Sequence, residues 1–315
     1  MIRYLLGRIP SIAVVLFVAS IIAFLLPRLA PGDPAIIIAG PDATPEVIEA
    51  IRREAGLDQP LILQYLSWVA GIFRGDLGTS YISNRPITEL ILSRAQSTLE
   101  LASLAAIFMI VLALILGVLG GSVRSRTGRT VLDIVSTAMI SMPAFLVGLV
   151  LIVIFGVVLK VLPVSGELNM SEDFFGGLEY LLLPAIAISL SHAAVIARLL
   201  QTSMLTNRGE EFVDLATAKG ASPARITFRH VLPASLDTAI VAIGLRIGEL
   251  IGGAIIIEAI FSRSGLGQLM IQAINTRDYF VVQALVIGAV IIAILSQLIS
   301  EIIVASLDPR IRLEA

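Results

Sequence analysis

The chain has 315 residues, of which 57% are hydrophobic and only 15% charged, and its mean hydropathy of +0.96 lies outside the range of ordinary globular domains and within that of multi-spanning membrane proteins. The absence of cysteine excludes a disulfide framework, a thiolate metal site and a cysteine nucleophile. The net charge of -2 argues against a nucleic-acid partner, because phosphate binding needs a concentrated basic field.

The first apolar run, residues 9–26, is too long for the hydrophobic part of a cleaved signal peptide. No small-residue cleavage pattern follows it at once, so we expect a retained transmembrane helix over residues 1–28. Five further runs are long enough to cross about 30 Å of hydrocarbon: 98–120, 132–159, 180–200, 236–260 and 281–305. The sequence therefore predicts an all-α polytopic membrane protein with six transmembrane helices.

Lysine and arginine in the short loops predict the orientation of these spans, because cytoplasmic loops carry an excess of both. With the N-terminus inside, three basic residues fall in the two short outer loops: Lys160, Arg263 and Arg277. Eleven fall in the inner segments: Arg3, Arg8, Arg124, Arg126, Arg129, Arg208, Lys219, Arg225, Arg229, Arg310 and Arg312. This asymmetry places both termini in the cytoplasm and residues 29–97 outside.

The outer segment, residues 29–97, is too polar to span a membrane and too regular to be disordered. Thr44 and Pro45 begin a predicted helix that Gly56 ends, and Pro60 begins a second one. We expect a small helical cap, for which two interpretations stay open. It is either a docking or gating surface for an external partner, or a scaffold that rests on the bilayer with Tyr65 and Trp68 as interface anchors.

Two features within the predicted spans call for an explanation. Pro143 and Pro184 should kink or interrupt their helices. Arg246 and Glu249 lie near mid-depth, three residues apart on one face of the fifth span. Because a charged residue at the bilayer centre costs at least about 2.5–3.5 kcal/mol, these two must either pair with each other or face a water-filled cavity, where Arg246 would attract an anionic group of a substrate.

A polar and basic stretch, EFVDLATAKGASPARITFRHVLP at residues 211–233, separates the fourth span from the fifth. Gly220 suits the left-handed position that ends a helix, Ser222 can cap the next helix, and Pro223 fits a first helical turn. The stretch therefore predicts two short helices that meet at a corner on the cytoplasmic side.

The chain shows no sign of catalytic chemistry of its own. A nucleotide-binding P-loop needs a Gly-Lys pair, whereas Lys160 follows Leu159 and Lys219 follows Ala218. His192 and His230 are too few and too far apart to suggest a metal site. A transporter of this composition would need a separate cytoplasmic motor, so we expect neither an enzyme activity nor a cofactor in this chain.

The stretch DLATAKGASPARITFRHVLP resembles the cytoplasmic "EAA" loop of permease subunits of ATP-binding-cassette (ABC) importers, with Gly220 as the central glycine and Leu232-Pro233 as the closing pair. Further segments look like the dipeptide, oligopeptide and nickel family, of the first-subunit ("B") type, and together cover about residues 1 to 310. These segments are LAPGDPA at 29–35, GLDQPLILQYLSWV at 56–69, GDLGTSYISNRPI at 75–87, FRHVLP at 228–233 and IFSRSGLGQL to NTRDYFVVQA from 260 to 284.

The resemblance implies a type I importer permease fold with an extracytoplasmic segment at 29–97, a five-helix core at 98–310 that carries a coupling loop at 207–233, and a cytoplasmic tail at 311–315. It also implies a heterodimer with a second permease, two cytoplasmic ATPases that bind ATP and Mg, and an external substrate-binding protein. The residues implied to couple to the ATPase are Asp214, Ala216, Ala218, Lys219, Gly220, Ser222, Pro223, Arg225, Leu232 and Pro233.

The resemblance further implies alternating access that moves di- or oligopeptides across the cytoplasmic membrane. Nickel chelates or oligosaccharides are the alternative cargo for the same machinery. Two interpretations from other classes are a non-transporting membrane scaffold or sensor and an ion-coupled carrier that works alone. Arg246 favours a substrate with a carboxylate, so we expect Arg246 and Glu249 to line the substrate pathway if they do not simply pair.

Overall fold

The computed structural model describes residues 2–29, 33–40, 42–123 and 125–307. Arg124, Arg310 and Arg312, which contribute to the predicted orientation, lie outside these ranges, as do residues 30–32 and the predicted tail at 311–315. All regular elements in the described ranges are helical, which confirms the predicted all-α class. Five helices are long and apolar enough to cross a membrane, or six spans if a bent helix pair counts as one.

The long helices are α1 (Ile2–Leu25), α5 (Ile87–Ser122), α8 (Phe174–Asn207), α11 (Leu232–Ile260) and α13 (Tyr279–Leu307). Shorter α-helices are α2 (Pro34–Ala39), α3 (Pro45–Glu54), α4 (Leu61–Phe73), α6 (Arg126–Ser141), α7 (Ala144–Leu151), α9 (Glu211–Ala218), α10 (Pro223–Ile226) and α12 (Leu266–Thr276). A 3-10 turn at Leu26–Leu29 extends α1, and π-helical segments follow α7 at Ile152–Val158 and α10 at Thr227–Val231.

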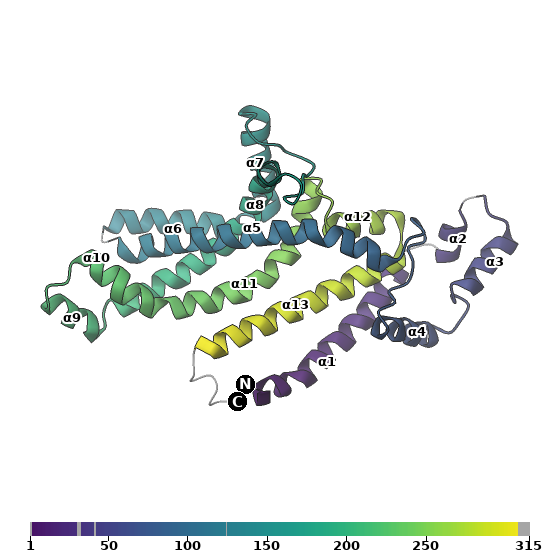
Figure 1. The fold of residues 1–315 in the computed structure, drawn as a ribbon, viewed down its shortest axis with the longest axis horizontal. Coiled ribbons are helices and arrows are strands. Elements are labelled where there is room, and N and C mark those ends of the chain that lie inside the picture. The colour runs from purple at the N-terminus through teal and green to yellow at the C-terminus, as the bar shows by residue number, and fades with distance from the viewer. Residues whose placement is uncertain (1, 30–32, 41, 124, 308–315) are drawn as a thin grey trace. The chain divides into compact units, whose positions relative to one another are not determined.

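By their contacts, these elements form two compact units. The first unit is built around Thr98–Arg263, and the second joins Leu5–Ser97 to Ser264–Ile294. The helices α5 and α13 are each divided between the units, with one end in the first unit and the other end in the second. Figure 1 shows the elements of each unit.

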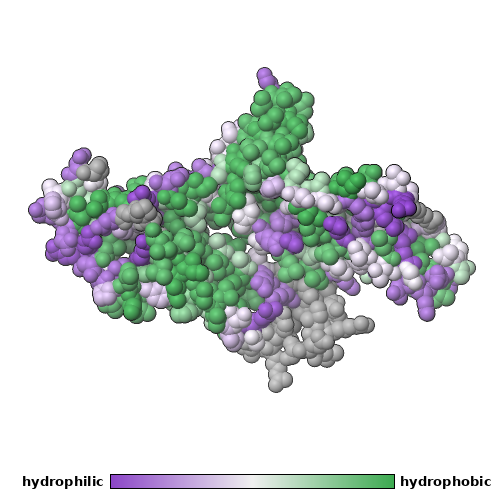
Figure 2. Space-filling model, turned by 180° about the vertical axis from the view of Figure 1, so that it is seen from behind, coloured by the Kyte–Doolittle hydropathy of each residue, from purple (hydrophilic) through white to green (hydrophobic). Residues whose placement is uncertain are grey.

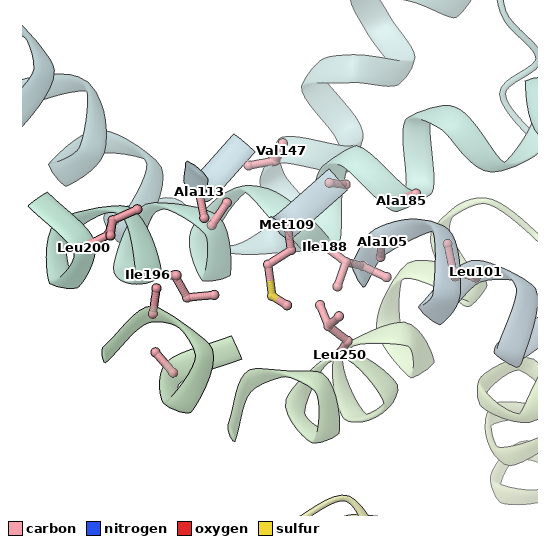
Figure 3. Close-up of a cluster of buried hydrophobic side chains, with 14 of the residues drawn as sticks. Leu101, Ala105, Met109, Ala113, Val147, Ala185, Ile188, Ile196, Leu200 and Leu250 are labelled. Carbon is pink, nitrogen blue, oxygen red and sulfur yellow. The ribbon is translucent and has the colours of Figure 1, made fainter. Parts of the chain in front are cut away.

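The first unit has an apolar core between α5, α7, α8 and α11. Figure 3 shows side chains from all four helices meeting there, with Met109 of α5 among them. Glycines let α5 approach α8 closely, since a Cβ atom at Gly117 would lie 2.8 Å from Leu200, and one at Gly121 would lie 2.7 Å from Met204. Small residues at such a seam allow dispersion contacts between whole helices, which drive helix association where lipid removes the hydrophobic effect.

The third predicted span, residues 132–159, is not one continuous helix. The helix α6 ends at Ser141, Pro143 stands before the first residue of α7, and the two helical segments meet at 101°. Proline cannot donate a backbone hydrogen bond, and it disfavours helical backbone at the residue before it, so the helix stops there. The interruption predicted at Pro143 is therefore confirmed, whereas α8 runs through Pro184 without a break.

The surface of the first unit is strongly apolar along its helices. Figure 2 shows hydrophobic side chains over nearly the whole of the segment 144–158, which projects at the top of the view. Its exposed side chains are Phe145, Leu146, Leu149, Val150, Val153, Ile154, Val157 and Val158. An apolar surface this continuous suits contact with lipid rather than with water.

The second unit contains α1, the predicted cap helices and α12. As predicted, Thr44 stands before α3 with Pro45 as its first residue, Gly56 follows with a φ of +65°, and Pro60 stands before α4. The Oδ1 atom of Asp33 caps α2 by accepting a hydrogen bond from the amide of Ala35 at 3.0 Å. The second unit also has a small core of its own, formed by Ile87, Leu269, Ala273, Val281, Val282, Ala284 and Leu285.

Candidate functional site

The corner predicted between the fourth and fifth spans is present at residues 211–233, where α9 and α10 lie at one end of α8 and α11 (Figure 1). Gly220 ends α9 with a φ of +77°, in the left-handed region that glycine adopts without strain. Its amide donates to the carbonyl of Thr217 at 2.9 Å, and the amide of Ala221 donates to the carbonyl of Ala216 at 3.1 Å. This pair of bonds is the Schellman motif, so the turn is fixed by the backbone itself.

The second arm of the corner is continuous with the fifth span. Ser222 caps α10 through its Oγ atom, which accepts from the amide of Arg225 at 3.4 Å, and Pro223 is the first residue of α10. The helix then passes through the π-helical segment Thr227–Val231 into α11, so that residues 223–260 form one helical unit. A displacement of the corner would therefore move α11 directly, because no flexible loop intervenes.

Side chains at the end of α8 hold the corner in place. The Arg208 guanidinium donates through Nε to the carbonyl of Gly121 at 2.8 Å and through one terminal nitrogen to Oγ1 of Thr227 at 2.8 Å. The Nδ2 atom of Asn207 donates to Oγ of Ser235 at 2.8 Å. These bonds join the end of α5, the end of α8 and the start of α11 at one junction.

The corner presents a mixed surface whose inner side belongs to the core. Ala216 is buried and Leu232 half-buried, whereas the other predicted coupling residues are exposed: Asp214, Ala218, Lys219, Gly220, Ser222, Pro223, Arg225 and Pro233. Two large apolar side chains lie among them, with Leu215 63% and Phe228 62% exposed. Exposed apolar anchors with a charged rim are characteristic of protein–protein contact surfaces.

Arg246 and Glu249 of α11 form an ion pair, as one of the two predicted alternatives required. The same Glu249 carboxylate lies 3.5 Å from Nδ1 of His192 on α8, a neighbour that sequence spacing did not indicate. Arg246 and Glu249 remain 33% and 49% exposed in the chain. The ion pair therefore offsets part of the free-energy cost of placing these two charges in a membrane. The exposed parts of both side chains still need a polar environment other than lipid.

Sequence reasoning missed a buried ionic cluster at the end of α11. The Arg263 guanidinium is fully buried with one nitrogen 3.5 Å from the Glu167 carboxylate, although the residue counted only as a loop charge in the sequence. Glu258, to which the sequence assigns no role, is also fully buried and accepts a hydrogen bond from Thr98 Oγ1 at 2.6 Å. Burial lowers the pKa of Arg263, and Glu167, Glu258 and Glu100 oppose this.

The described residues hold no group of three or more His, Asp or Glu side chains placed to bind a metal ion. The corner of α9 and α10 is a candidate contact surface because it exposes Leu215 and Phe228 among charged side chains. What it can do is mechanical, because its two arms are continuous with or tied to the ends of α5, α8 and α11.

Comparison with known proteins agrees with this geometry. Residues 1–102 match the family "Binding-prot-dependent transport system membrane comp, N-term". The chain is 34% identical over 309 residues to a "Probable peptide ABC transporter permease protein y4tP" of Sinorhizobium fredii, covering 98% of this chain and 99% of that one. It is 32% identical over 312 residues to the "Glutathione transport system permease protein GsiC" of Escherichia coli K12, covering 99% of both chains.

Among solved structures, an inward-facing form of the MetNI methionine ABC transporter matches with a TM-score of 0.57 at 20% sequence identity, covering 70% of this chain and 96% of that one. This likeness supports the type I permease fold that the resemblance implied. Residues 109–313, which include the corner, match the family "Binding-protein-dependent transport system inner membrane component". The chain thus belongs to the family of membrane permease components of binding-protein-dependent transport systems.

Proposed function

We propose that this chain is the transmembrane subunit of an ABC importer that carries small peptides, and that the corner of α9 and α10 couples it to its motor. The observation that carries the proposal is the continuity of the corner with α11 over residues 223–260. A motor that binds the corner would turn its own closure into a rigid-body movement of α11, which is how packed helices transmit a local displacement. The peptide cargo is supported by relatives whose names specify peptide and glutathione transport.

The proposed assembly contains a second permease subunit, two cytoplasmic ATPases and an extracytoplasmic substrate-binding protein. ATP and Mg bind to the ATPases, since neither lysine of this chain stands in a P-loop. The chain lies in the cytoplasmic membrane with its termini and the corner on the cytoplasmic side, in accordance with the excess of basic residues there. The proposal thus excludes an ATPase activity, and any cofactor, from this chain itself.

Arg246 and Glu249 line the substrate pathway in this proposal. Because both are partly exposed in the single chain, and because lipid is a poor environment for either, their exposed side faces water or the second permease. A peptide carries a carboxylate and an ammonium group at its ends, which an Arg and a Glu can bind. The two residues would then distinguish zwitterionic peptides from uncharged substrates.

Co-purification with and without a corner anchor tests the coupling role. Phe228→Ala should weaken binding of the ATPases at least about fivefold, because truncating an interface anchor costs at least about 1 kcal/mol. Phe175→Ala, which removes an even more exposed ring from the first turn of α8, should leave the complex intact. Binding would be measured with the purified ATPases and the permease pair in detergent.

Three outcomes would contradict the proposal. They are unchanged ATPase binding by the Phe228→Ala variant, equal loss in both variants, and substrate uptake by this chain alone on an ion gradient. The last would favour an ion-coupled carrier. A chain that binds ATPases but moves no peptide in proteoliposomes with its binding protein would instead favour a scaffold or sensor.

A further inference from the structure

The second unit contains a cavity of about 310 Å³ at the end of α1. Its lining combines the basic side chain of Arg28, the carboxylates of Glu54 and Asp76, and the rings of Phe24, Trp68 and Phe280. The volume is at the lower end of the range for small-molecule sites, which is about 300–1,000 Å³. A cavity that offers a cation, two anions and aromatic faces suits a small ligand with both charges.

Arg28 is the cationic group of this cavity. Its guanidinium donates to the carbonyl of Phe24 at 2.7 Å and to Oε1 of Gln64 at 3.0 Å, and its Cζ atom lies 3.6 Å from the centre of the Phe24 ring. Among the residues that the structure describes, no carboxylate lies within ion-pair distance of it. Both of these acceptors are neutral, so several guanidinium N–H groups remain for an anionic oxygen.

Burial lowers the pKa of Arg28, with the neighbouring Tyr81 acting in the opposite direction. A partly buried guanidinium without a carboxylate partner is destabilised by lost hydration, and a bound anion would compensate for it. A bound anion would therefore stabilise the folded protein at this position, whereas a neutral ligand would leave the Arg28 charge without a counterion.

The surroundings of the cavity locate it at a membrane surface. The candidate span of α1 ends at Leu25, three residues before Arg28. Trp68 and Tyr65 of α4 pack on Phe24, with ring centres 5.9 and 5.4 Å from the Phe24 ring, as in the aromatic belts of membrane proteins. The helix α4 also exposes large apolar side chains, which suits insertion at the interface: Leu61, Ile62, Leu63, Leu66 and Phe73.

We propose that this cavity binds the headgroup of a zwitterionic phospholipid that carries a primary amine, with its phosphate at Arg28 and its ammonium toward Glu54 and Asp76. Phosphate is the anion that a membrane surface presents in highest density, and guanidinium binds it through two parallel hydrogen bonds. The ammonium is attracted by the carboxylates and by the face of Trp68. A bound lipid would fix the end of α1 against α4, in the unit that carries the helical cap.

Native mass spectrometry of the full chain in detergent tests the proposal, with phosphatidylethanolamine, phosphatidylglycerol and phosphatidylcholine titrated separately. We expect phosphatidylethanolamine to bind most tightly. Arg28→Gln should weaken its binding about tenfold or more, because a charge-assisted hydrogen bond is lost. Arg74→Gln, an exposed arginine at the end of α4 outside the cavity lining, is the matched control and should change nothing.

A second variant keeps the test decisive if Arg28→Gln fails to fold. Glu54→Gln removes an exposed carboxylate at the cavity and should lower the binding of phosphatidylethanolamine to the level of phosphatidylglycerol. Equal binding of the three lipids, or unchanged binding in both variants, would overturn the proposal. Soluble glycerophosphoethanolamine that binds as tightly as the lipid would also overturn it, by assigning the cavity to a soluble phosphoester. None of these results depends on transport.

Discussion

A hydrogen bond of 2.8 Å from the Arg208 guanidinium to Oγ1 of Thr227 joins the end of α8 to the π-helical segment that begins the fifth span. The same guanidinium holds the carbonyl of Gly121 at the end of α5. One side chain thus fixes the corner relative to two other long helices. Replacing either Arg208 or Thr227 removes the bond between them.

Arg208→Gln and Thr227→Val should each loosen the corner. A hydrogen bond from a charged donor contributes about 1.5–3 kcal/mol, so amide exchange in residues 211–226 should quicken about tenfold or more. The double variant should be no worse than Arg208→Gln alone, because the bond that Thr227→Val removes is already absent when Arg208 is replaced. Thr202→Val, which loses only a bond within α8, is the control, and additive effects in the double variant would refute the prediction.

Gly220→Val should uncouple ATP hydrolysis from transport while the chain still inserts into the membrane. A Cβ atom at Gly220 would meet nothing within 4 Å, so the cost comes from the φ of +77° rather than from a clash. A β-branched residue in this region is strained by about 1–2 kcal/mol or more, whereas asparagine tolerates it. The ratio of transport to ATP hydrolysis in proteoliposomes should fall for valine and stay near normal for asparagine. Full transport by Gly220→Val would count against the coupling role.

Arg246→Gln should lower transport of peptides with a free C-terminal carboxylate more than transport of amidated ones. The ion pair with Glu249 complicates the single variant, because its loss leaves a charge near mid-span. The double variant Arg246→Gln with Glu249→Gln removes that problem. If it restores transport of both peptide forms, the residues serve only as a pair, and the pathway role is wrong.

Arg263→Met should destabilise the first unit by about 3–5 kcal/mol, because it leaves buried carboxylates without their cation. Adding Glu258→Gln should recover part of the loss, since one fewer negative charge is then buried near Glu167 and Glu100. Thermal unfolding in detergent measures both effects. An exposed arginine of the same unit, replaced in Arg225→Met, should change the midpoint little, and equal effects would contradict the prediction.

The second unit should lose stability as the pH rises from about 4. Burial raises the pKa of Asp278, although hydrogen bonds from Ser80 and from the backbone of Val281, Ile82 and Tyr81 act against this. A carboxyl group that holds its proton more tightly in the folded chain stabilises folding fully below its ordinary pKa, and this contribution is lost as the pH rises through the raised pKa.

Asp278→Asn should therefore flatten the pH dependence of the unfolding midpoint above about pH 4, the ordinary carboxyl range. The amide oxygen can still accept the bond that Ser80 Oγ donates to Asp278 at 2.5 Å. Asp58→Asn, at an exposed position, should keep the dependence of the unchanged chain. A slope that is the same in all three proteins would show that Asp278 does not control it.

Apolar run lengths and helix-capping residues were sufficient to predict most of the helices. Apolar length identified the spans, and Thr44, Gly56 and Pro60 placed α3 and α4, whereas α2 was not predicted. The corner followed from Gly220, Ser222 and Pro223 for the same reason, since helix ends depend on residues within about one turn. The interruption at Pro143 was predicted as well, but the angle of 101° between the two helical segments was not, because the sequence marks Pro143 without giving the direction that the next helix takes.

Contacts between distant residues were not predictable in the same way. Arg263 counted only as a loop charge in the sequence, and nothing there singled out Glu258, yet both are fully buried. The neighbourhood of Glu249 and His192 joins α8 to α11 across many residues, and the bond from Arg208 to Gly121 joins α8 to α5. Such contacts depend on how each helix is rotated and packed against its neighbours, and no pattern within a single sequence gives this.

The sequence by itself determined that this chain crosses a membrane several times, that two short helices begin near Pro45 and Pro60, and that a capped corner at residues 211–233 separates two of the spans. Hydrophobic length and capping are local properties, so they can be read along the chain. Only the tertiary structure decided that α10 continues into α11, that Arg208 holds the corner, and that Arg28 faces a cavity. These depend on which helix faces meet, and helix packing fixes that through contacts between residues far apart in sequence.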